Sequence, residues 1–392
     1  MRVFGFLTVF LTFPILNLLA QKIYVDISSP SYNPVKLAIL GDSSDGISNI
    51  INKLKYNLST IGYFEIVSSD QDLALSISKS KDEIVISLKS REGDVFNSKA
   101  LKNESVDGLA FSIANKILES VVNINEGPFG TPFVFTSDMS GKKEIYMSFF
   151  VSEKIKRMTH HNQSAISPTI SPDGTKIAYI SFYGSKPELF LIDLTDKKIK
   201  KPLSKPGIFM SPFFINNNEM LLSWNNGDNA KIYIFDVERI SLKKITAGES
   251  DVSATISPDG NILAVSSKRD GTPQIYLYDM QKSRLKRLTF SGSYNASPSF
   301  SPKGDEIVYT KLVGDKFDIY ITSLKDEEEK PLIKGFGSSE SPTWTPDGNF
   351  IVFSSNIDGD YDLYVTDRKG SFIRKIFDTV YNETQVSFPL RR

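Results

Sequence analysis

The 392-residue sequence contains no cysteine and only two histidines, the adjacent pair His160 and His161. The lack of cysteine excludes disulfide bonds, thiolate nucleophiles, iron–sulfur clusters and cysteine-ligated zinc sites. Two histidines provide few side chains for histidine-based acid–base catalysis or metal binding. The composition therefore favours a binding protein over an enzyme, and we expect no cofactor and no metal site.

An excess of charge of either sign is also absent, because 46 lysines and arginines balance 46 aspartates and glutamates. A neutral chain has no bulk electrostatic attraction to a phosphate backbone, so nucleic acid is not an expected partner. The hydrophobic share of 40% and the charged share of 23% are typical of a globular protein. The length leaves room for two or three domains of roughly 100–200 residues.

A single long uncharged run follows Arg2 and extends from Val3 to Ala20. A basic start, an apolar centre and a small residue before Gln21 are typical of a secretory signal peptide. We therefore expect residues 1–20 to be cleaved and the mature protein to be outside the cytoplasm and not membrane-spanning. The absence of cysteine excludes a lipoprotein anchor. The alternative is an uncleaved membrane anchor, since the run just reaches the length that spans a bilayer.

Residues 21–125 mix the periods of strands and helices, which predicts an α/β domain. Ser105 is a candidate N-cap for a helix whose apolar stripe extends from Val106 to Val122. An earlier helix is predicted from Ile47, Ile50, Ile51, Leu54 and Leu58. Strands are predicted at Lys22–Ile27, Val35–Leu40, Tyr63–Val67, Leu73–Ile77 and Ile84–Leu88. Residues 126–132, which are rich in glycine and proline, are the expected linker.

From residue 133 onward a repeat of about 44 residues replaces the helical period. One marker is a Ser/Thr-Pro-x-Gly turn, which begins at Ser171, Ser257, Ser301 and Thr345 and is degenerate at Ile215. The second marker is an aromatic residue in a strand, at Tyr146, Phe190, Tyr233, Tyr276, Tyr320 and Tyr364. Both markers have the same period, so the repeat does not depend on either one alone.

Each repeat contains four short β-prone segments, which is the pattern of a β-propeller blade. The first unit, Phe133–Thr159, supplies only three of its four strands, and Gln385–Leu390 at the end of the chain supplies the missing one. We therefore predict that residues 133–392 form an all-β six-bladed propeller closed by the C-terminal strand, which leaves no exposed edge.

The repeats resemble those of the TolB-type propeller family. The resemblance rests on Ser257–Val265, Tyr276–Asp279 and Lys286–Thr289. The segment Ile61–Phe64, the hinge Glu126–Gly130 and the ending Gln385–Pro389 are similar to the same family. The likeness covers essentially the whole mature chain in domain order and length.

This resemblance implies a non-catalytic periplasmic adaptor of the Tol–Pal system, which maintains outer-membrane integrity and invagination during cell division. It implies that the propeller mouth binds the lipoprotein Pal. We expect a monomer. The resemblance further implies that an N-terminal arm pairs with TolA of the inner-membrane TolQ–TolR–TolA complex. The residues of this arm are Gln21, Lys22, Ile23, Tyr24, Val25, Asp26 and Ile27.

The predicted partner-binding mouth consists of the loops that lead into the first strands. The candidate exposed anchors are Ile208, Phe209, Met210 and Tyr294, because apolar and aromatic side chains ringed by polar groups are favoured at protein interfaces. The alternative is that Phe209 and Tyr294 pack between blades. The predicted acidic rim is Asp251, Glu340 and Glu383. The full predicted set is Gln163, Ile166, Ser167, Phe209, Met210, Asp251, Ser253, Tyr294, Asn295, Glu340 and Glu383.

Enzyme signatures are incomplete. Gly41-Asp42-Ser43 is similar to the nucleophile block of Gly-Asp-Ser lipases, but the Asp-x-x-His partner is missing, so a helix-capping turn is favoured. The Gly-x-Ser-x-Gly elbow of a peptidase is absent as well. Two alternatives to the adaptor stay open: a secreted propeller enzyme or glycan-binding protein that uses the central channel, and an exported scaffold with an unrelated partner.

Overall fold

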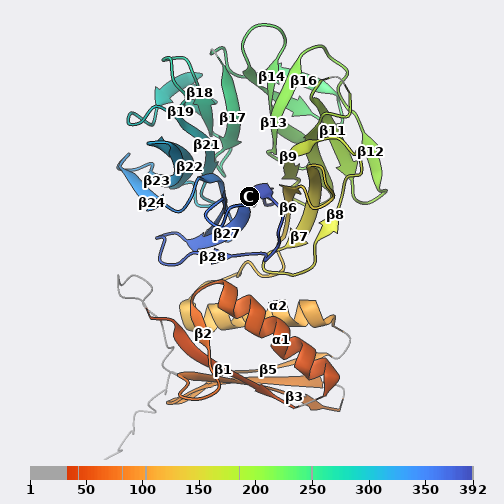
Figure 1. Ribbon diagram of the computed structural model, residues 1–392, viewed down its shortest axis with the longest axis vertical. Helices are drawn as coiled ribbons and strands as arrows, with labels where there is room; N and C mark the ends of the chain where they lie inside the picture. The colour runs from red at the N-terminus through yellow and green to blue at the C-terminus, as the bar shows by residue number, and fades with distance from the viewer. Residues whose placement is uncertain are drawn as a thin grey trace, which may run out of the picture.

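A computed structural model describes residues 33–390, apart from residues 43, 82, 102, 103, 185 and 249. These residues form an α/β layer followed by a ring of β-sheets (Figure 1). The predicted fold class, an α/β N-terminal domain and a six-bladed β-propeller, is confirmed. The predicted signal peptide and the predicted arm Gln21–Ile27 lie outside the described residues.

The N-terminal sheet has the strand order β2-β1-β3-β4-β5, in which β1 is parallel to β2 and β3 and the other pairs are antiparallel. Leu73, Leu75 and Ile77 alternate with more exposed residues and are buried on one face, as the period of a half-buried strand requires. The elements are β1 (Val35–Gly41), α1 (Asp45–Thr60), β2 (Phe64–Ile66), β3 (Leu73–Ser80), β4 (Glu83–Ser90), β5 (Gly93–Leu101), α2 (Val106–Ile117) and the π-helical turn η1 (Leu118–Val122).

The second helix begins where the sequence predicts it. The Ser105 hydroxyl accepts a hydrogen bond from the Gly108 N–H at 3.0 Å, so it satisfies a backbone donor that the first turn leaves free. Leu109, Ile113 and Ile117 are buried, and the stripe continues through η1. The two helices pack against each other and cover the apolar face of the sheet (Figure 1).

The described part of the chain from residue 132 forms six four-stranded antiparallel sheets around a central axis. Blade 1 consists of β29 (Glu383–Ser387), β6 (Pro132–Ser137), β7 (Glu144–Phe149) and β8 (Lys156–Arg157). Blade 2 consists of β9 (Ala165–Ile170), β10 (Lys176–Ser181), β11 (Glu188–Asp193) and β12 (Lys198–Lys200). Blade 3 consists of β13 (Ile208–Phe214), β14 (Glu219–Asn225), β15 (Lys231–Asp236) and β16 (Ser241–Lys244).

The remaining blades follow the same order along the chain. Blade 4 consists of β17 (Asp251–Ile256), β18 (Ile262–Ser267), β19 (Gln274–Asp279) and β20 (Arg284–Arg287). Blade 5 consists of β21 (Asn295–Phe300), β22 (Glu306–Val313), β23 (Lys316–Ser323) and β24 (Glu329–Ile333). Blade 6 consists of β25 (Ser339–Trp344), β26 (Phe350–Ser355), β27 (Asp362–Asp367) and β28 (Arg374–Lys375).

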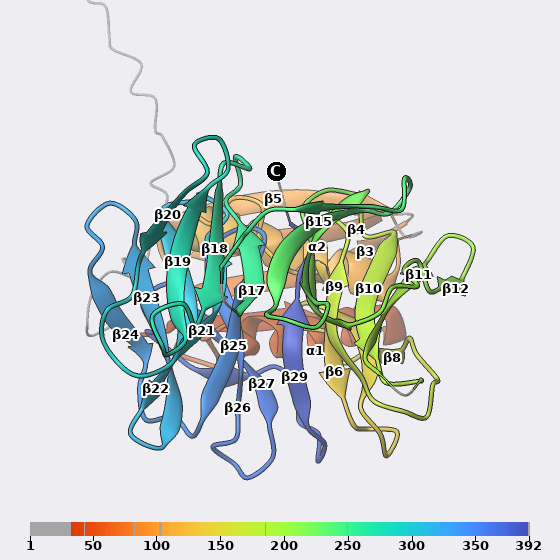
Figure 2. The same cartoon turned by 90° about the horizontal axis from the view of Figure 1, so that it is seen from above.

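The ring closes in blade 1, where strand β29 from the end of the chain lies beside β6 (Figure 2). Glu383 pairs with Ser137, and Thr384 pairs with Thr136. The predicted closure by the C-terminal strand is therefore confirmed. The strand begins two residues before the predicted Gln385 and ends at Ser387.

The two ends of the ring differ in the connections that they carry. We call turn face the end with the turns between first and second strands, among them the predicted Ser-Pro-x-Gly turns. We call loop face the opposite end, which carries the connections from second to third strands and from each fourth strand to the next blade. The loop-face connections include residues 182–187, 226–230, 268–273, 288–294, 356–361 and 376–382.

The N-terminal domain packs against the blades where the ring closes, next to β7, β8, β27 and β28 (Figure 1). The Tyr56 hydroxyl donates a hydrogen bond to the Ile376 carbonyl at 2.6 Å. Gly62 has a φ of 69°, and a Cβ there would lie 2.4 Å from the Phe372 ring. Tyr63 meets the same ring edge-on, with 5.4 Å between centroids. The two domains therefore share one apolar core at this interface.

We expect Gly62→Ala to destabilise the protein by about 2–4 kcal/mol, because a side chain at positive φ is strained and its Cβ also displaces Phe372. Gly174→Ala is the matched control, since Gly174 has a φ of 70° and nothing within 4 Å of the added Cβ. Its expected cost is only about 1–2 kcal/mol. Urea unfolding of both variants measures the difference; equal losses would show that the Phe372 contact contributes nothing.

Candidate partner-binding face

Each first strand contains a β-bulge at the same position, where one residue adopts a positive φ. These residues are Ser167 (52°), Ser211 (47°), Ser253 (50°), Ser297 (52°), Ser341 (53°) and Gln385 (55°). Positive φ is uncommon outside glycine, so neighbouring contacts must hold it. The Ser167 N–H donates to Gln385 Oε1 at 2.9 Å, and the Ser341 N–H donates to Thr310 Oγ1 at 3.0 Å.

These bulges surround a central channel with a cavity of about 170 Å³. All residues that line the cavity are uncharged, and each blade contributes its bulge residue. Prolines follow the bulge in four blades, for example Pro168, which an innermost strand tolerates because one of its edges is not hydrogen-bonded. The lining of the channel is therefore partly polar but carries no charge.

The end of the chain crosses the turn-face end of this channel. Pro389 lies beside Pro172 and Pro346 at the turn face, and Leu390 packs against the apolar cluster of blades 3 and 4. The C-terminus is accordingly near the centre of the ring (Figure 1). The end of the chain therefore covers part of the turn-face end of the channel.

Several predicted mouth residues lie in the central channel or at the loop face. Ser167 and Ser253 line the channel, and Gln163 is exposed in the loop before β9. Tyr294 is 37% exposed, with its ring edge-on to Phe317 at 5.5 Å. The predicted residues that are only half-buried at this face are Ile166, Met210 and Glu340.

Four predicted surface positions are buried, so the prediction that they are exposed is wrong. Phe209 is 2% exposed, stacks on Trp224 at 5.7 Å and belongs to an apolar cluster shared by blades 2 and 3, so the alternative that it packs between blades is correct. Asp251 is fully buried and forms an ion pair with Arg269 at 2.8 Å. Asn295 and Glu383 are also fully buried. The acidic rim is therefore reduced to Glu340, whose Oε1 accepts a hydrogen bond from the Tyr361 hydroxyl at 2.6 Å.

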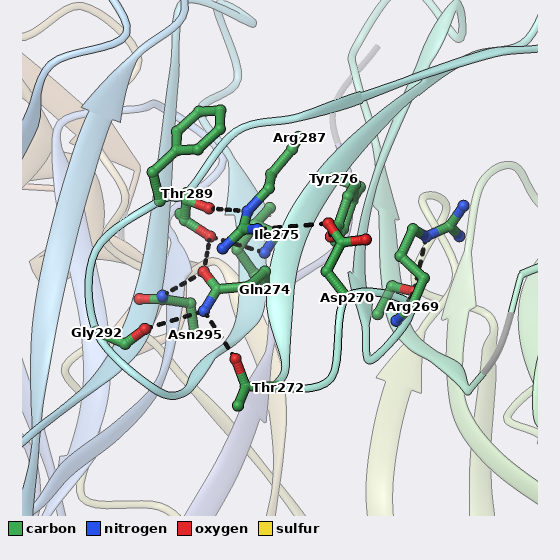
Figure 3. A network of polar contacts seen from close by, with 12 residues as sticks. Arg269, Asp270, Thr272, Gln274, Ile275, Tyr276, Arg287, Thr289, Gly292 and Asn295 are labelled. Carbon is green, nitrogen blue, oxygen red and sulfur yellow. Dashed lines mark hydrogen bonds and ion pairs between the residues drawn. The ribbon is translucent and has the colours of Figure 1, made fainter.

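Hydrogen bonds from buried polar side chains hold the loop-face connections in place, as blade 4 illustrates (Figure 3). Gln274 Oε1 accepts hydrogen bonds from Thr289 Oγ1 and from Asn295 Nδ2, both at 2.8 Å. Thr289 Oγ1 in turn accepts from the Ile275 N–H at 2.9 Å. This network fixes both ends of the connection 288–294, which presents Phe290 and Tyr294 to solvent.

The same threonine recurs in other blades, although the sequence analysis assigns it no role. Thr159 Oγ1 accepts from the Ile145 N–H at 2.9 Å, and Thr246 Oγ1 accepts from the Ile232 N–H at 3.1 Å. Two basic residues and an apolar residue precede each of these threonines, and this pattern is the signal that marks the positions. Each threonine joins the third strand of its blade to the segment that leads to the next blade, and so fixes where that segment begins.

Glu383 is the first residue of the closing strand. Burial, reinforced by the negative charges of Asp362 and Asp138, raises the pKa of Glu383 to about 8, although a hydrogen bond from Thr379 opposes this shift. Its Oε1 accepts that hydrogen bond, and within the described residues its Oε2 has no partner. The carboxyl group therefore holds its proton at neutral pH.

Exposed large apolar side chains are concentrated on the loop face. Among the described residues, 13 such side chains are exposed, and 9 of them belong to loop-face connections or to the strand ends beside them. The nine are Phe182, Tyr183, Ile208, Phe290, Tyr294, Val313, Ile357, Val380 and Tyr381. By the same criterion the turn face of the described ring has two, Phe149 at the end of β7 and Ile240 in the turn between β15 and β16.

The two histidines are adjacent in the connection between β8 and β9. His161 Nε2 lies 2.6 Å from the Tyr179 hydroxyl, and its ring packs against Phe190 at 5.1 Å, so the side chain fills a gap in blade 2. No group of three or more histidines, aspartates or glutamates in the described residues is arranged to hold a metal ion. Over the same residues, no helix has the length and apolar character that crossing a bilayer requires.

Residues 158–389, more than half of the chain, match the family model of the TolB beta propeller domain. The chain belongs to the TolB β-propeller family. A TolB homologue from Chlorobium chlorochromatii is 35% identical over 142 residues, which are 36% of this chain and 32% of that protein. A Tol-Pal system protein TolB from Desulfotalea psychrophila is 25% identical over 223 residues, 49% of this chain and 51% of that protein. The chain thus matches about a third of the first relative's length and half of the second's.

The likeness to solved TolB structures extends over both domains. The crystal structure of TolB from Acinetobacter baumannii has a TM-score of 0.81 to this chain, covers 92% of this chain and 97% of its own, and is 20% identical in sequence. At this identity the comparison concerns the fold. It covers the α/β layer as well as the ring, so the TolB arrangement of two domains is present here.

Proposed function

We propose that this protein is a non-catalytic periplasmic adaptor of the Tol–Pal system, whose loop face binds the lipoprotein Pal. The observation that carries the proposal is the concentration of exposed apolar side chains on that face. Monomeric proteins rarely leave such side chains clustered unless a partner covers them. Membership of the TolB family, and the name of the Desulfotalea relative, support the Tol–Pal assignment. The role in outer-membrane integrity and invagination during division follows from that system.

The rigidity of the loop face supports binding to a folded partner. Anchored connections such as 288–294 lose little conformational freedom when they bind, so more of the contact energy remains as affinity. The aromatic rings of Phe290, Tyr294 and Tyr381 supply the large contact areas that interface hot spots favour. A ring scaffold with fixed loops is thus well suited to binding a folded partner. The buried polar groups contribute to binding because they position these loops.

We further propose that Gln21–Ile27 pair with TolA once residues 1–20 have been removed in the periplasm. The alternating apolar residues Ile23, Val25 and Ile27 favour addition of this segment as a strand to a partner sheet. A chain that begins at residue 28 should lose TolA binding and keep Pal binding, both measured by calorimetry with purified soluble domains. Unchanged TolA affinity would refute this part of the proposal.

The loop-face assignment predicts the effect of two charges placed on exposed apolar positions. The double variant Phe290→Asp/Val380→Asp should bind the soluble domain of a Pal-type lipoprotein at least about tenfold more weakly, because both side chains would lie in a desolvated contact. The two residues are 68% and 78% exposed, so the fold should tolerate the changes. Calorimetry of the purified full chain with that domain measures the loss.

Ile240→Asp is the matched control, since Ile240 is 60% exposed but lies on the turn face. It should leave the affinity unchanged. The proposal fails if the lipoprotein domain does not bind the wild-type chain, or if Ile240→Asp weakens binding as much as the double variant does. Circular dichroism of all three proteins shows that the fold is kept.

A further inference from the structure

A pocket of about 310 Å³ opens on the loop face between blades 3, 4 and 5, separate from the central channel. Met210, Val252 and Ala296 from three successive first strands form its apolar wall, and Tyr294 stands at its rim. The volume is at the lower end of the range of small-ligand pockets, which suits one large side chain. The Phe317 ring packs edge-on against Tyr294, so the rim of the pocket is already formed before a partner binds.

One buried polar group in the pocket wall lacks a partner. Ser266 is 1% exposed, lines the pocket, and its Oγ forms no hydrogen bond to any described residue. Buried hydroxyl groups in folded proteins are nearly always hydrogen-bonded. Less than 1 Å² of this oxygen is accessible, so an occupant with a polar group beside its apolar part would satisfy the hydroxyl after a rotation of the Ser266 side chain.

The electrostatics of the pocket favour an anionic occupant. Lys268 is the single charged residue among those that line it. Within the described part of the chain Lys268 has no ion-pair partner, whereas the neighbouring Arg269 is neutralised by Asp251. A cation at the edge of an apolar pocket complements a carboxylate that lies next to an apolar group.

We propose that this pocket is the subsite of the loop face that takes an aromatic or large aliphatic side chain of the partner together with an adjacent carboxylate. The inference rests on the proposed function, since it specifies the chemistry of the partner that the loop face would bind. This proposal places the partner specificity of the loop face in the pocket between blades 3, 4 and 5. The central channel does not provide it, because the residues that line the channel are uncharged.

The test uses two small probes, N-acetyl-phenylalanine and its uncharged amide, titrated into the full chain and followed by NMR. The acid should bind several-fold more tightly than the amide, and Lys268→Gln should abolish that preference. Ser266→Ala should weaken binding of both probes by about threefold. Ser223→Ala should have no effect: its hydroxyl is equally buried and unpartnered one blade away but does not line the pocket. Equal affinity for the two probes, or equal effects of the two serine variants, would overturn the proposal.

Competition with the lipoprotein domain separates this inference from the proposed function. The acid should displace a bound Pal-type domain from the wild-type chain but not from Lys268→Gln. If the domain binds and the probe does not displace it, the pocket assignment is wrong and the proposed function stands. If the domain fails to bind while the probes behave as expected, the proposed function is wrong and the chemistry of the pocket stands.

Discussion

A chain that ends at Asn382 is expected to lose the cooperative unfolding of the ring. This truncation removes β29, so β6 becomes an open edge with unpaired backbone groups. It also removes Phe388, which packs against Phe133 at 5.2 Å between ring centroids and against Phe150 at 6.0 Å. Loss of one such buried aromatic side chain costs about 3–5 kcal/mol. With the lost strand, the total approaches the stability of a typical domain, about 5–15 kcal/mol.

Urea titration followed by tryptophan fluorescence measures this loss, because Trp224 and Trp344, the two tryptophans, lie in blades 3 and 6. A synthetic peptide of residues 383–390 should restore part of the transition when added to the truncated chain, and a scrambled peptide should not. A truncated chain that unfolds cooperatively at the wild-type midpoint would show that the ring does not depend on its closing strand.

Glu383→Gln is expected to stabilise the protein at alkaline pH. In the folded chain Glu383 keeps its proton up to about pH 8, whereas in the unfolded chain it loses it near pH 4.5. The folded state therefore binds more protons between these pH values, and the stability of the wild type falls as pH rises through this window. Glutamine cannot ionise, so the variant avoids the loss. The gain at pH 9 has an upper bound of roughly 5 kcal/mol and should vanish near pH 4.

Glu329→Gln provides a control of opposite sign. Burial alone would raise the pKa of Glu329, but hydrogen bonds from Lys311, Ser291 and the Phe290 N–H lower it. Its ionised form therefore stabilises the folded state above about pH 4.5, and this contribution is lost as pH falls below that value. The variant should be less stable than the wild type at pH 7–9. Urea midpoints measured from pH 4 to 9 test both variants; a pH-independent difference for Glu383→Gln would contradict the account.

The ring is predictable from the sequence because its signals are local and repeated. The turn residues and the strand aromatics recur with one period, and the incomplete first unit points to the closing strand. Strand β5 is not predictable in this way. Its apolar residues form two adjacent pairs, Val95–Phe96 and Ala100–Leu101, instead of alternating, so the segment becomes a strand through pairing with β4, in which Leu101 lies opposite Glu83.

The buried mouth residues could not be predicted, because their environment comes from other segments. Asp251 and Asn295 are polar residues at strand starts, which is typical of a surface position, and only Arg269 and Gln274 in blade 4 make them internal. Phe209 lies just before the bulge at Ser211, which shifts the register of β13 against β14. Since serine does not signal positive φ, the sequence alone does not place the bulge.

Hydrogen exchange of the full chain, with and without the soluble domain of a Pal-type lipoprotein, shows which face the partner covers. We expect the bound domain to slow exchange in loop-face connections, above all 268–273, 288–294 and 376–382, and to leave the turns at 171–175 and 257–261 unchanged. Protection confined to those turns, or no protection anywhere at saturating partner, would contradict the assignment of the loop face as the partner-binding surface.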